Sequence, residues 1–178
     1  MSGLLALDAG DTAEAARSAA RALELCRAAR CPGAGAIVNL QARAAFLSGD
    51  LAGAITFAEK ARSLNLAAKD EEELGNSSRI IADAEIGAGR HDAAARAYST
   101  ALALDKKLGL DAKILLDLLG LGTSARDEGR TRAALDYFER ARAVARAAGD
   151  ETGTTEIDAL IEALPPANQE TRESIPVR

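Results

Sequence analysis

Residues 82–105 read ADAEIGAGRHDAAARAYSTALALD, and the spacing of small residues in this stretch decides the fold. Within it, Gly89 stands five residues before Ala94 and twelve residues before Ala101. The same order of glycine and two alanines recurs at intervals of 39 or 40 residues, starting from Gly10, Gly49, Gly89 and Gly129. Self-similarity at a fixed interval of this length indicates a repeat protein.

Apolar residues on both sides of each glycine follow helical spacing. Ile80, Ile81 and Ala84 precede Gly89, and Ala97 follows it with further apolar residues three and four positions apart. This spacing predicts amphipathic helices. A glycine between two helices can adopt the left-handed conformation that ends the first helix and reverses the chain. Each repeat is therefore predicted to be an antiparallel helical hairpin.

Two further features of each hairpin follow from the sequence. Polar residues just after the turn are expected to cap the second helix, and they are Asp11, Asp50 and Thr131. Two helices approach closely only where small residues occupy the crossing. We expect the crossings where Ala42, Ala82 and Gly122 face Ala54, Ala94 and Ala134.

Composition excludes several protein classes. Aromatic residues make up 3% of the 178 residues and tryptophan is absent, which argues against an all-β fold. Charged residues at 28% and hydrophobic residues at 48% are in the globular range. A net charge of -5 and a pI near 5.0 argue against binding to nucleic acid, which needs a basic face. The absence of a long uncharged apolar run argues against a membrane span.

The sequence offers few residues for catalysis or metal binding. His91 is the single histidine, and it is expected to pack at the start of a second helix. Cys26 and Cys31 lack the CxxC spacing of redox and zinc motifs. They are expected to be reduced thiols at a helix end, with a local disulfide in an exported protein as the alternative. No enzyme activity, cofactor or metal is predicted.

The pattern resembles the tetratricopeptide repeat, in which glycine is followed by alanine at five, a large residue at nine and alanine at twelve. The clearest copies are residues 82–105 and residues 118–143, LLGLGTSARDEGRTRAALDYFERARA, with Tyr98 and Phe138 as the large residues. The resemblance covers about residues 3–148. Its 40-residue unit is similar to the extended variety found in bacterial regulators and light-chain-type adaptors. HEAT and armadillo repeats share the length but lack this pattern.

The resemblance implies an all-α, right-handed superhelical array of antiparallel hairpins, an α-solenoid of four repeats plus a C-terminal capping helix. We expect a repeat domain at 1–164, with repeats at about 1–30, 34–69, 72–109 and 111–149, a capping helix at 151–164 and a flexible tail at 165–178. Only nine residues precede Gly10, so the first helix is expected to be clipped and a longer sequence or a signal segment to have preceded it.

In such arrays the first helix of each hairpin lines an inner wall that binds partners. The resemblance places nine candidate groove residues there: Asn39, Arg43, Phe46, Arg79, Asp83, Ile86, Leu119, Thr123 and Arg126. The arginines among them could bind an acidic or C-terminal carboxylate group, or they could simply be solvated. Phe46, Tyr98, Tyr137 and Phe138 are expected in the core. Chaperone adaptors of the family hold a carboxylate with Lys and Asn, but the matching positions here are Asn39 with Arg43, Ile80, and Leu116 with Gly120.

The resemblance implies a non-catalytic protein–protein interaction or scaffold module. We expect a peptide or protein segment of acidic and apolar character across Arg43, Arg79 and Leu119. The alternative is a ligand- or peptide-sensing regulatory domain of a larger bacterial regulator. The apolar run Ile114 to Leu121 predicts a hydrophobic partner site or association between copies of the chain. The expected compartment is the cytoplasm, or the periplasm or exterior if a signal segment precedes the chain.

Overall fold

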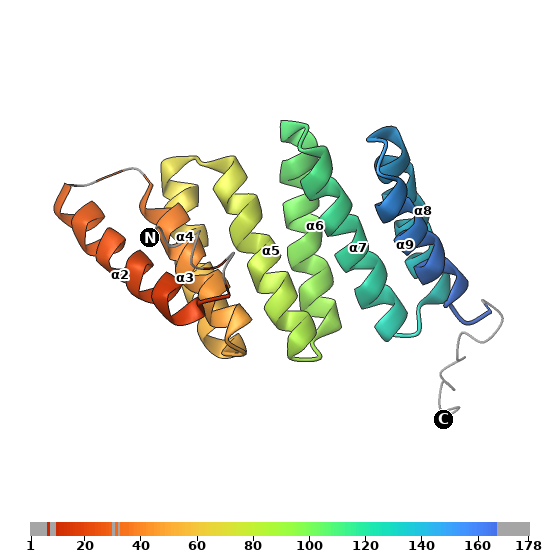
Figure 1. Ribbon diagram of the computed structural model, residues 1–178, viewed down its shortest axis with the longest axis horizontal. Coiled ribbons are helices and arrows are strands. Elements are labelled where there is room, and N and C mark those ends of the chain that lie inside the picture. Colours follow the sequence, from red (N-terminus) through yellow and green to blue (C-terminus); the bar gives the residue numbers. More distant parts are fainter. Residues whose placement is uncertain (1–6, 8–9, 30, 32, 167–178) are drawn as a thin grey trace, which may run out of the picture.

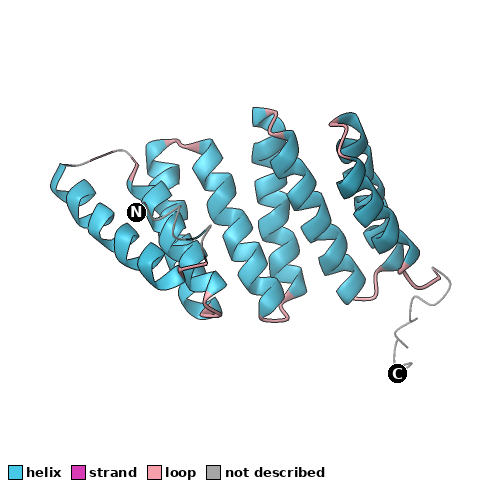
Figure 2. Ribbon diagram, viewed as in Figure 1, coloured by secondary structure: helices cyan, strands magenta, loops and turns pink. Residues whose placement is uncertain are grey.

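The computed structural model describes residues 7, 10–29, 31 and 33–166. This part of the chain folds into eight α-helices and contains no strand. Figure 2 shows the helices joined by short loops. The helices are α2 (Thr12–Ala29), α3 (Ala34–Leu47), α4 (Leu51–Ala68), α5 (Glu71–Gly87), α6 (His91–Leu108), α7 (Asp111–Asp127), α8 (Thr131–Ala147) and α9 (Glu151–Glu162). Part of the predicted first repeat and most of the predicted tail lie outside the described residues.

The helices form a single curved row (Figure 1). Each helix packs against the next one along the chain, from α2 to α9. In addition, α3 packs against α5 and α5 packs against α7, so the first helices of neighbouring hairpins crowd together along one wall. The all-α helical repeat array predicted from the sequence is confirmed.

Glycines with positive φ form the turns inside the hairpins. Gly10, Gly49, Gly89 and Gly129 have φ angles of 77°, 84°, 71° and 73°. At one of these turns the Asp50 N–H donates to the carbonyl of Ala45 at 2.9 Å, which closes the end of α3. These glycines occupy equivalent corners, as the repeat pattern predicts, because the left-handed region is strained for residues with a side chain.

Aspartates cap the helices that follow several turns. Asp50 accepts a hydrogen bond from the Gly53 N–H at 2.8 Å, and Asp11 accepts one from the Glu14 N–H at 2.8 Å. The prediction for Thr131 is wrong: it is the first residue of α8, its side chain is buried, and Arg130 before it makes no side-chain cap. Asp70 and Asp150 provide caps for α5 and α9 that were not predicted from the sequence.

The hairpin crossings are built from alanine and glycine. Ala42, Ala54, Ala82, Ala94 and Ala134 are completely buried. A side chain on Gly122 would first meet the ring of Phe138, one turn further along α8 than the expected partner Ala134. A Cβ placed on Gly122 would lie 2.4 Å from that ring. The small residue at this crossing therefore makes room for an aromatic ring.

Replacing Ala94 by leucine is expected to overpack the crossing of α5 and α6. Ala94 has no exposed surface and belongs to the same buried cluster as Ala82. We predict a loss of about 1–3 kcal/mol in the free energy of unfolding, measured by urea denaturation. Ala103→Leu, at an exposed position of the same helix, is the control and should change stability by less than about 0.5 kcal/mol. Equal effects of the two substitutions would contradict this packing.

The apolar run in α7 is mostly used by the core. Ile114, Leu118 and Leu121 are buried, and Leu115 and Leu119 pack against the same cluster. Leu116 in the same run has 53% of its surface exposed. The continuous apolar sequence thus reflects a helix with neighbours on several sides, because α7 packs against α5, α6 and α8.

Cys26 and Cys31 are joined by a disulfide bond. The expectation of reduced thiols is therefore wrong, and the alternative of a local disulfide describes the structure. The Cα atoms lie 5.0 Å apart, within the range that a disulfide requires. The bond ties the last turns of α2 to the segment that leads into α3. None of the helices described is long and apolar enough to cross a membrane.

Candidate functional site

The wall formed by the first helices contains a cavity of about 230 Å³ between α3 and α5. It is open to solvent on one side, and α7 contributes one residue at its edge. The lining residues are Ala36, Asn39, Leu40, Arg43, Glu73, Asn76, Arg79, Ile80, Asp83 and Lys113. Apolar side chains and charged groups of both signs therefore meet in one small space.

The structure brings four of the nine predicted groove residues into this cavity. They are Asn39, Arg43, Arg79 and Asp83. The other five lie elsewhere along the same helices. Ile86 and Leu119 pack against the main buried cluster, and Arg126 donates to the Asp127 carboxylate at 2.9 Å. Phe46 and Thr123 are half-buried outside the cavity.

Arg43 is the exposed cation of the cavity wall. It makes no hydrogen bond or ion pair with any residue that the structure describes, although its charge acts on the nearby Asp83 carboxylate. An exposed guanidinium without a partner keeps all its donors available for a carboxylate or phosphate. Of the three predicted arginines, Arg43 is the one that is exposed in the cavity wall.

Asp83 is held from behind by Tyr98. The Tyr98 hydroxyl donates to the Asp83 carboxylate, and the tyrosine ring packs over Gly120, where a Cβ would lie 2.2 Å from the ring. Burial raises the pKa of Asp83 above its usual value, while the hydrogen bond and the charges of Arg79 and Arg43 oppose this effect. Tyr98 is thus a core residue, as expected, that also fixes a carboxyl group in the cavity wall.

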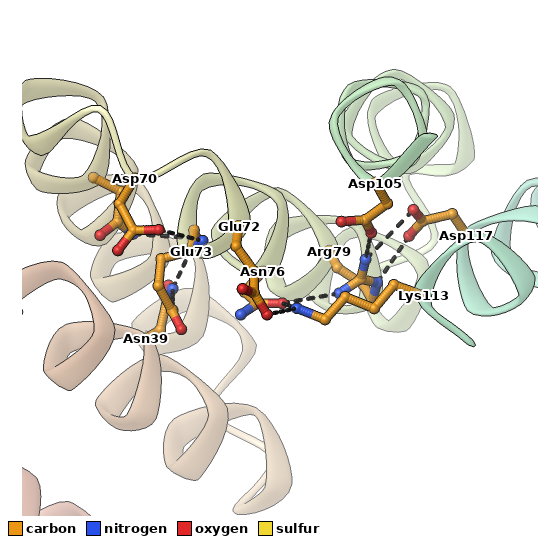
Figure 3. A network of polar contacts seen from close by, with 10 residues as sticks. Asn39, Asp70, Glu72, Glu73, Asn76, Arg79, Asp105, Lys113 and Asp117 are labelled. Atoms are coloured by element: carbon orange, nitrogen blue, oxygen red, sulfur yellow. Dashed lines mark hydrogen bonds and ion pairs between the residues drawn. The ribbon is translucent and has the colours of Figure 1, made fainter. Parts of the chain in front are cut away.

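Arg79 is bound inside the protein rather than free in the groove (Figure 3). Its Nε donates to Asp117 Oδ1 at 2.8 Å, and its Nη2 donates to Asp105 and, at 3.4 Å, to Asp117 Oδ2. Its Nη1 donates to Asn76 at 3.2 Å. Both aspartate side chains are fully buried, and the arginine side chain is 13% exposed. This guanidinium is therefore occupied by two internal carboxylates.

The buried carboxylates share one cation. The pKa of Asp117 is raised to about 7, mainly by burial and also by the neighbouring Asp105, against the opposing hydrogen bond and charge of Arg79. One oxygen of Asp105, Oδ1, is buried without a hydrogen-bond partner among the described residues. The site consequently holds more negative than positive charge when both carboxylates are ionised.

A chain of polar contacts links this buried site to the cavity mouth. Lys113 donates to Glu72 at 2.9 Å and to Asn76 at 2.9 Å, and Asn76 also accepts the hydrogen bond from Arg79. Figure 3 shows these side chains meeting from α5 and α7. The position of Asn76 in the cavity wall therefore depends on Arg79 and on Lys113.

A second network, built around uncharged side chains, joins α3, α4 and α5 as Arg79, Asp105 and Asp117 join α5, α6 and α7. The Ser77 hydroxyl accepts from Asn65 at 3.0 Å and donates to Asn39 at 2.8 Å. The Asn39 amide donates to the Glu73 carbonyl at 2.9 Å and to its carboxylate at 2.7 Å. Asn39, predicted as a groove residue, therefore fixes Glu73 in the cavity wall.

The repeat interval of 40 residues relates these two networks. Each consists of one residue from a first helix, one from the second helix of the same hairpin and one from the next first helix. We call them the first junction (Asn39, Asn65 and Ser77), the middle junction (Arg79, Asp105 and Asp117) and the third junction (Leu119, Ala145 and Ile157). The third is apolar and belongs to the main buried cluster. The equivalent contact between neighbouring hairpins is thus neutral and polar in the first junction, ionic in the middle junction and apolar in the third junction.

In the first and middle junctions, a glycine packs closely against the residue that the second helix contributes. A Cβ on Gly35 would lie 1.7 Å from Asn65 Oδ1, and a Cβ on Gly75 would lie 3.1 Å from Asp105 Oδ1. Gly35 and Gly75 are themselves 40 residues apart. The glycine makes room for the polar side chain of the neighbouring helix, so the two junctions share their packing as well as their positions.

Several residues of the cavity and the junctions were not predicted from the sequence. Ala36 and Asn76 lie three residues before Asn39 and Arg79. Glu73 lies six residues before Arg79, and Lys113 lies 40 residues after Glu73. The repeat interval and helical spacing together could have found them. Asp105 and Asp117 gave a weaker signal, since their partnership becomes visible only when three helices are placed together.

Other candidate residues have structural settings. His91 is half-buried as the first residue of α6, and its Nδ1 has no hydrogen-bond partner among the described residues. Phe138 is fully buried, while Tyr137 is half-buried and its ring lies 5.3 Å from the guanidinium carbon of Arg140. The described residues contain no cluster of His, Cys, Asp and Glu that could hold a metal ion.

Comparison with known proteins supports the repeat assignment. Residues 1–70 match the family described as tetratricopeptide repeat. No curated protein sequence matches the chain.

Two solved structures share the fold. BtubC (BKLC) from P. vanneervenii superposes with a TM-score of 0.70 at 20% identity, covering 99% of this chain and 83% of that one. A Podosopora anserina protein described as a kinesin light chain with nearly identical TPR-like repeats superposes with a TM-score of 0.66 at 15% identity, covering 95% of this chain and 93% of that one. Residues 1–70 therefore match the tetratricopeptide-repeat family by sequence, and the two solved structures share the helical-hairpin fold of the chain.

Proposed function

We propose that the chain is a non-catalytic protein-interaction module that binds a peptide or protein segment along the wall formed by α3 and α5. Tetratricopeptide repeats generally mediate protein–protein interaction or scaffolding, and this fold presents the first helices as one continuous wall. The observation that carries the proposal is the unpaired, exposed Arg43 beside a cavity of about 230 Å³.

The cavity suits a segment that places a carboxylate next to an apolar side chain. Arg43 offers a two-pronged set of donors to the carboxylate. Ala36, Leu40 and Ile80 offer apolar surface in the same cavity. Arg79 and Leu119 are engaged inside the protein, so in this proposal Arg43 is the anchor and the other two support the wall.

A peptide selection tests this function. A displayed library of random peptides is panned against the whole chain, and the most enriched peptide is synthesised with a fluorescent label. We expect enriched peptides to combine Asp or Glu with large apolar residues. In fluorescence anisotropy, Arg43→Glu should weaken binding at least about tenfold, since a charge-assisted contact becomes a repulsion.

The matched control reverses the same charge on another helix. Arg96 is exposed on α6 and does not line the α3–α5 cavity, and its side chain makes no hydrogen bond or ion pair with any described residue. Arg96→Glu should leave the dissociation constant within about twofold of the parent value, apart from a long-range effect that added salt screens. Equal weakening by both variants, or none by Arg43→Glu, would reject the cavity as the binding site.

A further inference from the structure

The three junctions differ in charge although they share one geometry. The first junction contains only neutral polar groups and the third only apolar groups. The middle junction buries two carboxylates against one guanidinium, and both aspartate side chains are completely shielded from solvent. A second cation would balance this site, but the structure places none within it, because the Lys113 ammonium group binds Glu72 and Asn76.

We propose that the middle junction takes up one proton between Asp105 and Asp117, and that this proton tightens the packing of α7 on the α5–α6 hairpin. The unpartnered Oδ1 of Asp105 shows that the hydrogen-bonding capacity of the pair is not met by Arg79 alone. Two carboxylates on one guanidinium carry a net negative charge, whereas a singly protonated pair with Arg79 is neutral. Burial favours the neutral arrangement.

The groups that face the carboxylates come from three helices. Arg79 and Asp83 belong to α5. Tyr98 belongs to α6, as does Asp105, one of the two carboxylates. On α7, Lys113 lies one turn before Asp117 and binds outward to Glu72. From the other side, α8 packs against α7 with Phe138 and the alanines of the main buried cluster, which carry no charge.

The direction of the pH effect follows from the protonation of Asp117. Its pKa is raised from 3.8 to about 7 in the folded chain, mainly by burial. A raised carboxyl pKa means that the closed junction binds the proton more tightly than an opened, hydrated one. The stabilisation is therefore fully present below about pH 4 and is lost as the pH rises through about 7. Opening of α7 becomes easier toward alkaline pH.

This junction is connected to the wall of the cavity. Arg79 lines the cavity and reaches the buried carboxylates, and its Nη1 holds Asn76, which also lines the cavity. A change in the middle junction therefore acts on the cavity wall as well as on the stacking of α7. The first junction, with Ser77 at the position of Asp117, has no ionisable group among its three residues and serves as an internal reference.

Hydrogen exchange as a function of pH tests the proposal on the full chain. After correction for the intrinsic pH dependence of amide exchange, we expect the opening constant of α7 to rise by roughly 10- to 100-fold between about pH 5 and pH 8, because the rise is at most about tenfold per pH unit and ends above the raised pKa of about 7. The opening constant of α5 at the first junction should change less. Asp117→Asn, which keeps the shape of the protonated acid, should make the opening of α7 independent of pH.

A second measurement does not depend on any variant folding well. Carbon-13 labelling of the aspartate carboxyl groups, with the resonances assigned, should show that Asp117 titrates near pH 7 in the parent chain, apart from Asp83, whose pKa burial also raises. Copying the first junction into the middle one, by Arg79→Asn with Asp105→Asn and Asp117→Ser, should remove the Asp117 resonance. The proposal is overturned if every aspartate titrates in the ordinary acidic range, or if Asp117→Asn retains the pH dependence of α7 opening.

Discussion

Arg79→Asn should be among the most destabilising single substitutions in the chain, with a loss of about 3–5 kcal/mol in the free energy of unfolding at about pH 8. It removes the one guanidinium that both buried carboxylates of the middle junction contact. Asp105 and Asp117 would then face each other without a cation in a space closed to water. Urea denaturation followed by circular dichroism measures the effect.

The matched variant adds Asp105→Asn and Asp117→Ser to Arg79→Asn. This triple variant reproduces the first junction, where Asn39, Asn65 and Ser77 hydrogen-bond one another beside a glycine. Because Gly75 leaves room beside position 105, as Gly35 does beside Asn65, the neutral set should fit. We expect it to recover most of the stability lost by Arg79→Asn. If it is as unstable as the single variant, the loss does not come from unpaired buried charge.

Phe138→Ala should have an effect of similar size. Phe138 is completely buried in the main cluster, and its ring lies against Gly122 of α7. Truncation to alanine removes the ring and leaves a cavity, with an expected loss of about 3–5 kcal/mol in the free energy of unfolding. Thermal and urea unfolding both measure it.

A double-mutant cycle shows whether the loss arises at this crossing. Gly122→Ala alone should destabilise the parent chain, because the added Cβ would lie 2.4 Å from the Phe138 ring. In the Phe138→Ala background the same methyl group enters empty space, so it should be neutral or stabilising. The two substitutions should therefore be coupled by more than about 0.5 kcal/mol. Additive effects would contradict direct packing of this pair.

The sequence predicted the corners of the array well because backbone geometry restricts them strongly. A residue without a side chain adopts positive φ with little strain, so the positions of Gly49 and Gly89 in the sequence indicate the turns. The buried alanines follow from the close approach of helices for a similar reason. Lys69, with a φ of 58°, ends α4 in the turn between two hairpins, where Gly109 and Gly149 occupy the same position in the next two repeats, so a lysine stands here where the repeat otherwise has glycine.

The candidate site was only partly predictable, because groove positions and junction positions overlap. Asn39 and Arg79 lie on helix faces that turn toward both the cavity and the neighbouring hairpin. Sequence spacing alone does not show whether such a side chain contacts the cavity or the neighbouring hairpin. Arg79 is drawn inward by Asp105 and Asp117, which belong to two other helices, whereas Arg43 has no such partners and stays exposed.

Thr131 and the two cysteines show how local context outweighs residue preference. Threonine favours the N-cap, but the turn after Gly129 places Arg130 there and buries Thr131 as the first residue of α8. Cys26 and Cys31 are joined because the chain leaving α2 brings their Cα atoms to 5.0 Å. The Cys31 N–H donates to the Cys26 carbonyl at 3.1 Å, a close return of the chain that the spacing of the cysteines alone did not predict.

The inner wall between α3 and α5 is the surface on which the proposed function depends, and chemical-shift mapping tests it most directly. The selected peptide is titrated into the isotope-labelled chain, and amide shifts are followed by nuclear magnetic resonance. We predict the largest shifts around Asn39, Arg43 and Asn76 on α3 and α5. Shifts concentrated on α4 and α6, with those residues unchanged at saturation, would contradict binding at this wall.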